Sequence, residues 1–250
     1  MVCNLAFGQK IDLPPMRTAL NVGDQPVAIV ISGSVTALPA DRDRAAFHVA
    51  VSADLGDLQD RITPILQAQL NRDDRCGERL SIRQATLVPS APAGTLNAGL
   101  HYEKWACVKA FGKNIAKKLA GGDGTVQVRL TPAIRDGDTV RLDAQLGEIQ
   151  ADGSIGELLR SPSFADALRE RITRALEKVP LEAAIPSALR NTARIDDVSF
   201  ADAAGRLTLK LRATVTVPAR DAQTLLDRLA KGETPPPPAA ATSQPDARAR

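Results

Sequence analysis

The sequence predicts an α+β fold in which a curved antiparallel sheet wraps around long amphipathic helices. Several segments alternate apolar and polar residues with the period of two that marks half-buried strands. Two other segments repeat apolar residues three or four positions apart, which is the spacing of a helix with one buried face. The order hairpin, helix, hairpin occurs in residues 27–108 and again in residues 125–217. This recurrence predicts an internal duplication, with a chance match of patterns as the alternative.

Composition sets the predicted domain boundaries. Residues 1–26 hold a Pro-Pro pair and few periodic apolar positions, so we expect an extended lead-in there. Residues 27–218 form the predicted β-rich domain with its two helices. A short helix is expected over residues 219–232. Residues 233–250 are a Pro/Ala-rich tail that cannot bury enough apolar surface to fold and is expected to be disordered.

The first predicted repeat opens with two strands. Residues 27–31 are a continuous apolar run, typical of a buried strand, and residues 47–51 alternate apolar and polar side chains. A helix follows, and its apolar stripe is Leu55, Leu58, Ile62, Ile65, Leu66 and Leu70. Residues 80–88 and 96–102 then flank a segment rich in turn residues, which predicts a hairpin.

The second predicted repeat has the same order of elements. Residues 126–130 and 140–146 alternate and predict a hairpin. A helix opens at Ser161 and Pro162, because serine caps helix N-termini and proline fits the first helical position. The stripe of this helix is Phe164, Leu168, Ile172 and Leu176. Two strands, at residues 195–200 and 207–217, complete the repeat.

Two of the three cysteines are placed to form a disulfide. Cys76 and Cys107 lie at matching depth beyond the hairpin, so antiparallel pairing brings their Cα atoms within the roughly 4–7 Å that a disulfide requires. The alternative is two unrelated buried thiols. A disulfide predicts a periplasmic or secreted protein. The first ten residues, Cys3 included, show no signal peptide, so the predicted export depends on this cysteine pair alone.

A basic segment follows Glu103. Five lysines fall within fifteen residues with no acidic residue among them: Lys104, Lys109, Lys113, Lys117 and Lys118. A helix over residues 108–119 would align Val108, Phe111, Ile115 and Leu119 on one face, and such a basic amphipathic helix is attracted to an anionic membrane surface. The predicted membrane-contact residues are Trp105, Lys109, Phe111, Lys113 and Lys117. The alternative is an ordinary surface helix that packs its apolar face on the sheet.

Composition and motifs argue against catalysis. The chain has two histidines, so the side chain used most in acid–base and metal sites is scarce. His101 and Glu103 would share one face of a strand, where an exposed polar pair is favoured over a general base and its orienting carboxylate. The net charge of +3 is too small to indicate nucleic acid. We therefore expect no catalytic residues, no metal site, no cofactor and no enzymatic activity, while the oligomeric state stays open.

The predicted architecture resembles the tubular lipid-binding superfamily, which includes the bactericidal/permeability-increasing proteins. The resemblance covers residues 27–217 and is carried by the two helix stripes and the long alternating strand at residues 207–217. It implies that the stripe residues face a lipid or another hydrophobic ligand: Leu58, Ile62, Ile65, Leu66, Phe164, Leu168, Ile172 and Leu176. The function expected first is an exported lipid or hydrophobic-ligand binding protein without catalysis. The alternative is a periplasmic envelope-assembly or protein-interaction module with a filled core.

Overall fold

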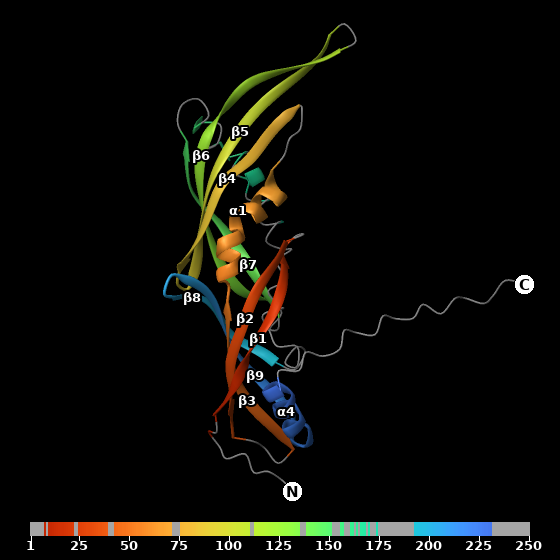
Figure 1. Ribbon diagram of the computed structural model, residues 1–250, viewed down its shortest axis with the longest axis vertical. Helices are drawn as coiled ribbons and strands as arrows, with labels where there is room; N and C mark the ends of the chain where they lie inside the picture. The colour runs from red at the N-terminus through yellow and green to blue at the C-terminus, as the bar shows by residue number, and fades with distance from the viewer. Residues whose placement is uncertain are drawn as a thin grey trace, which may run out of the picture.

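The strands of the computed structural model form two antiparallel sheets that follow one another along an elongated molecule (Figure 1). The described residues are 10–22, 25–39, 43–71, 76–110, 113–135, 139–151 and 193–231, with Gly8 and scattered positions between 156 and 174. No helix among them is long and apolar enough to cross a membrane.

The five-stranded sheet is built from the two ends of the chain. Its order is β1 (Lys10–Val22), β2 (Gln25–Ala37), β3 (Arg44–Asp54), β9 (Arg206–Pro218) and β8 (Ala193–Ala203). Alternate residues of β9 are buried along its whole length, as the period of two predicts. The pairing of β3 with β9 joins distant parts of the sequence, and the strand lengths in this sheet are similar.

The four-stranded sheet comes from the middle of the chain. Its order is β4 (Gly77–Ser90), β5 (Ala93–Ala110), β6 (Lys113–Arg135) and β7 (Thr139–Ala151). Both predicted hairpins are confirmed, because β4 pairs with β5 and β6 pairs with β7 in antiparallel register. The two middle strands are much longer than the two outer strands, and they rise together above the rest of the sheet in Figure 1.

Helix α1 (Gly56–Leu70) connects the two sheets. Its Gln59 side chain donates hydrogen bonds to the carbonyl oxygens of Leu87 on β4 (3.0 Å) and Gly205 in the β8–β9 turn (3.1 Å). The same side chain accepts a hydrogen bond from the Leu207 backbone N–H at 2.6 Å. One amide therefore ties the helix to both sheets, and it satisfies backbone groups that β4 and β9 leave free.

The expectation of one curved sheet wrapped around long helices is wrong. The described residues form two sheets, and their helices are short: α1 has 15 residues and α4 (Ala222–Lys231) has 10. The apolar stripe of α1 is real, but its length lets it cover part of β4 rather than line the inside of a tube. Strands supply most of the buried side chains, so the core is built mainly by the sheets.

The expected helix over residues 108–119 is also wrong, because this segment is the paired end of β5 and the beginning of β6. Glycine costs about 1 kcal/mol in a helix relative to alanine, and Gly112 lies in the middle of the expected helix and weakens it. Cross-strand pairing, which a local periodicity does not reveal, decides the conformation. The fold therefore turns the basic segment into a hairpin.

The predicted boundaries change at the N-terminal end. Strand β1 belongs to the expected lead-in and pairs along β2, so the folded body includes residues 10–22. At the C-terminal end α4 covers the predicted helix, and its Ala222, Leu225 and Leu226 are buried. The predicted tail, residues 233–250, lies outside the described residues.

The recurring order of elements does not carry over to the strand pairing. An exact repetition would map the β3–β9 contact onto a contact between β7 and β5, whereas β5 pairs with β6. The expected second helix is described only at scattered positions, where Ser161 Oγ accepts a hydrogen bond from the Phe164 N–H at 3.4 Å. The internal duplication stays a prediction.

Candidate functional site

The ends of β5 and β6 extend beyond their neighbours and form a two-stranded ribbon. The pairing of β4 with β5 begins at Gly77 opposite Trp105, and the pairing of β7 with β6 ends at Ala151 opposite Gly124. Residues 106–110 and 113–117, named here the β5–β6 ribbon, therefore pair only with each other among the described strands. At about 3.3 Å per residue, five residues reach roughly 16 Å past the sheet.

The β5–β6 ribbon carries large apolar side chains in contact with water. Val108 is 62% exposed and Ile115 is 54% exposed, and the two are direct cross-strand partners. Leu119, at the bulge below them, is 57% exposed. Because side chains alternate along a strand, Val108 shares a face of β5 with the buried Tyr102. The ribbon thus continues the core-facing side of the sheet past the point where the core ends.

Lysines flank this apolar pair on the same face. Lys117 pairs with Ala106 and lies two residues from Ile115, while Lys104 lies two residues before Ala106. Both lysine side chains are exposed, and no described acidic group forms an ion pair with either of them. Glu78 of β4 is the cross-strand partner of Lys104, whereas Ala106 is the partner of Lys117. This face therefore combines branched aliphatic side chains with positive charge.

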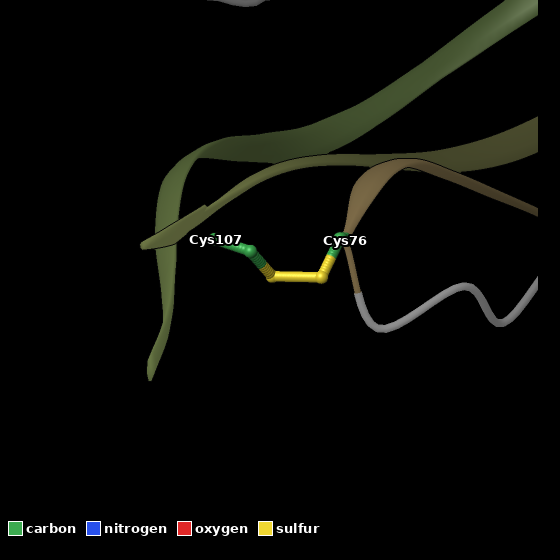
Figure 2. Close-up of a disulfide and its surroundings, with 2 residues drawn as sticks. All are labelled: Cys76 and Cys107. Carbon is green, nitrogen blue, oxygen red and sulfur yellow. A yellow bond between two sulfur atoms is a disulfide. The ribbon is translucent and has the colours of Figure 1, made fainter. Parts of the chain in front are cut away.

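The predicted disulfide between Cys76 and Cys107 is confirmed, with a Cα–Cα distance of 5.6 Å across 31 residues of sequence. Figure 2 shows that it joins Cys76, just before β4, to Cys107 on β5. An isolated two-stranded hairpin is at best marginally stable in water. The disulfide therefore braces the ribbon where the sheet no longer supports it, and it fits an oxidising environment.

A polar cluster fixes the opposite face at the ribbon's base. Glu103 accepts hydrogen bonds from Lys118 Nζ (2.5 Å) and Trp105 Nε1 (2.9 Å), and the Arg79 guanidinium lies 4.5 Å from the centre of the Trp105 ring system. These partners, Lys118 before Trp105, lower the pKa of the Glu103 carboxyl from 4.5 to about 2. The carboxylate is therefore held ionised as part of the framework of the sheet.

His101 and Glu103 share a face of β5, as the strand periodicity predicts. His101 Nε2 lies 3.3 Å from Glu103 Oε1, and Nδ1 lies 2.8 Å from Asp123 Oδ1. Arg83 forms an ion pair with the same Asp123 oxygen at 2.9 Å. Both ring nitrogens of His101 are therefore engaged by carboxylate oxygens, so neither is left to take a proton from a substrate. The geometry therefore favours a structural ion-pair network over an acid–base site.

The residues predicted to face a ligand lie in the core where the structure describes them. Leu58, Ile62, Ile65 and Leu66 of α1 are each buried in the cluster that unites both sheets. Phe164 and Leu168 are buried as well, and the Phe164 ring meets the Tyr102 ring edge to face at 5.3 Å. Ile172 and Leu176 lie outside the described residues.

The predicted membrane-contact residues are brought together at the ribbon, in a conformation that was not expected. Trp105 lies at its base, half-buried beside Arg79, and Lys117 is exposed within it. The backbones of Lys109 and Lys113 belong to the two strands of the ribbon. Phe111 lies outside the described residues.

Sequence reasoning assigned Val108, Ile115 and Leu119 to a helix and so did not single them out as exposed hairpin residues. The sequence does hold a signal for the pairing. Val108 and Ile115 are placed symmetrically about the Phe111–Gly112 step, and glycine is favoured in turns. A hairpin centred there makes the two residues cross-strand neighbours, as the structure does.

A second candidate is an open hollow of about 700 Å³ on the five-stranded sheet. Small side chains such as Ser32, Gly33 and Ser34 line it. Its charged groups largely neutralise one another, since Lys10 pairs with Asp12 and Arg212 pairs with Asp197. The hollow therefore offers a ligand less unpaired charge than the ribbon does.

The described residues contain no group of three or more His, Cys, Asp or Glu side chains placed to hold a metal ion. The ribbon, with its exposed aliphatic pair, its lysines and its disulfide, is therefore the strongest candidate site. No family model, curated protein or solved structure matches this chain.

Proposed function

We propose that the protein is an exported, non-catalytic lipid-binding protein that uses the β5–β6 ribbon. The observation that carries this proposal is the cross-strand pair of Val108 and Ile115, which stays more than half exposed on the core-facing side of the sheet. Exposed apolar patches on a folded protein mark interaction sites. Acyl chains are partners that aliphatic side chains without hydrogen-bonding groups accept readily.

The disulfide supports the proposed compartment. Cys76 and Cys107 are bonded at an exposed position, and exposed disulfides persist outside reducing cytosol. We therefore place the protein in a periplasm or outside the cell. The resemblance to the tubular lipid-binding superfamily implies the same class of ligand, and it stays a prediction.

Lipid capture tests the proposal directly. The protein is incubated with a zwitterionic lysophospholipid below its critical micelle concentration, and native mass spectrometry counts bound lipid. We expect adducts on the wild type and at least tenfold fewer on a V108S/I115S variant. V88S is the matched control, because Val88 is 47% exposed on β4 outside the ribbon. Bare polypeptide alone, under conditions that preserve lipid on a known lipid-binding protein, would refute lipid binding.

A second candidate function is a protein-interaction module of the cell envelope with a filled core. It is favoured by the burial of Leu58, Ile62, Ile65 and Leu66, which pack against other side chains. This candidate predicts that lipid is not captured and that the ribbon instead cross-links to a protein. A photo-reactive residue at position 115 distinguishes the two, because it marks lipid in one case and polypeptide in the other.

A further inference from the structure

The ribbon's partner can be specified further from its charge and reach. We propose that the β5–β6 ribbon docks on the surface of an anionic lipid bilayer, with Val108 and Ile115 entering the headgroup region and Lys104 and Lys117 facing the phosphates. This inference rests on the proposed lipid-binding function and narrows it from lipid in general to a negatively charged bilayer.

The ribbon is long enough for such a contact. Its five residues per strand reach roughly 16 Å beyond the sheet, and interfacial segments bury their apolar faces about 5–10 Å deep. The Val108–Ile115 pair lies at the third of five paired positions, so it can enter the interface before the body of the sheet meets the headgroups. The disulfide at Cys107 fixes the ribbon to β4 and so keeps its direction.

The charge around the apolar pair selects an anionic surface. Between Glu103 and Asp123 the chain has five lysines and no acidic residue. Glu103 lies on the opposite face and accepts a hydrogen bond from Lys118, so it does not neutralise Lys104 or Lys117. Glu78 lies opposite Lys104 on β4 but forms no ion pair with it. Each lysine near an anionic membrane strengthens binding about fivefold, which corresponds to about 1 kcal/mol.

A second copy of the chain fits this surface poorly. Face-to-face pairing of two ribbons would bring Lys104 and Lys117 of one copy against the lysines of the other. Like charges brought together in an interface oppose association. A bilayer of anionic lipids offers the opposite charge and an apolar interior in the same place, which matches both features of the ribbon.

Vesicle binding tests the inference with the full chain in its oxidised form. Vesicles of phosphatidylcholine alone are compared with vesicles containing one third phosphatidylglycerol, in flotation assays at low and at high salt. We expect binding to the anionic vesicles at least tenfold above binding to the neutral ones, and a marked loss at high salt. Trp105, the only tryptophan of the chain, reports docking through quenching by lipids brominated near the headgroup.

Matched variants locate the contact. K104Q/K117Q is expected to weaken binding to anionic vesicles about 25-fold, at about fivefold per lysine. K10Q/K210Q removes the same charge from exposed positions on the five-stranded sheet and is expected to change binding less than threefold. V108S/I115S should abolish quenching of Trp105, whereas V88S should leave it intact. Unchanged thermal unfolding shows that each variant is folded.

The outcomes separate this inference from the proposed function. Equal binding to neutral and anionic vesicles, or equal losses in K104Q/K117Q and K10Q/K210Q, would overturn anionic docking at the ribbon. Capture of monomeric lysophospholipid without binding to any vesicle would overturn the docking inference and leave lipid binding standing. Failure of both assays would overturn the two together.

Discussion

The two sheets differ in how well their strands match in length. In the five-stranded sheet the strands have 11 to 13 residues, and where β2 runs past the end of β3 its Val27 and Ile29 are buried. In the four-stranded sheet the outer strands have 14 and 13 residues while β5 and β6 have 18 and 23. The excess length carries the inner face of the sheet into water. A mismatch in strand length thus creates an exposed surface without any change in local strand pattern.

The two sheets should differ most in how much stability is lost when an apolar side chain is shortened. Leu209→Ala in the five-stranded sheet removes a side chain that is 2% exposed, so the free energy of unfolding should fall by about 2–5 kcal/mol. Ile115→Ala in the ribbon should cost less than about 0.5 kcal/mol. Urea titration measures both values. Similar losses for the two variants would show that the ribbon is packed in solution.

Removal of the disulfide should affect the two sheets differently. C76S/C107S is expected to lower the free energy of unfolding by about 2–4 kcal/mol. Hydrogen exchange should also accelerate first in residues 106–110 and 113–117, because β4 no longer braces them. Amides of β3 and β9 should keep their order of protection, and Cys3→Ser serves as the control. Uniform acceleration across both sheets would contradict a local bracing role.

Substitution of Gln59 should weaken the link between the two sheets. Gln59→Ala leaves the Leu207 N–H and two backbone carbonyls without this partner, at an expected cost of about 1–3 kcal/mol. The matched control is Gln223→Ala: the exposed Gln223 amide donates a hydrogen bond to Asp227 within α4, and its loss should lower the free energy of unfolding by less than about 0.5 kcal/mol. Two separate unfolding transitions in Gln59→Ala would show that this amide couples the sheets. Equal effects of the two variants would contradict its bridging role.

The smallest expected effect is the pH dependence at the ribbon's base. The folded protein holds the pKa of Glu103 at about 2, below its ordinary value of 4.5, so the carboxylate stabilises the fold fully above pH 4.5. This contribution is lost as the pH falls from 4.5 to about 2. The difference in melting temperature between wild type and Glu103→Gln should therefore be largest near neutral pH and vanish near pH 2. A difference in melting temperature that stays constant between neutral pH and pH 2 would contradict this contribution.

Much of the sheet structure is predictable from the sequence because alternation is a local signal. The strand at residues 207–217 and the hairpins of the four-stranded sheet follow from the period of two, and α1 follows from its stripe. The division into two sheets is not local, because it depends on which distant strands pair. The alternation of apolar and polar residues shows that β9 is a strand, but it does not show which strand pairs with β9. It therefore cannot distinguish two sheets from one continuous curved sheet.

The candidate site, too, could be predicted only where local sequence determines it. The disulfide could be predicted, because its position depends only on counting residues outward from one turn. The spacing of Val108, Ile115 and Leu119 fits a helix face as well as it fits one side of a hairpin with a bulge. Whether these residues are buried depends on where β4 and β7 end. That information lies in other segments of the chain, and the lysine pattern alone did not supply it.

The unequal strand lengths also have an evolutionary consequence. Side chains on the β5–β6 ribbon take little part in folding, so substitutions there are removed by selection only when they harm binding. The buried residues of β9 face the opposite situation, because nearly every change lowers stability. Mutations on the β5–β6 ribbon can therefore change binding specificity with little effect on the stability of the fold.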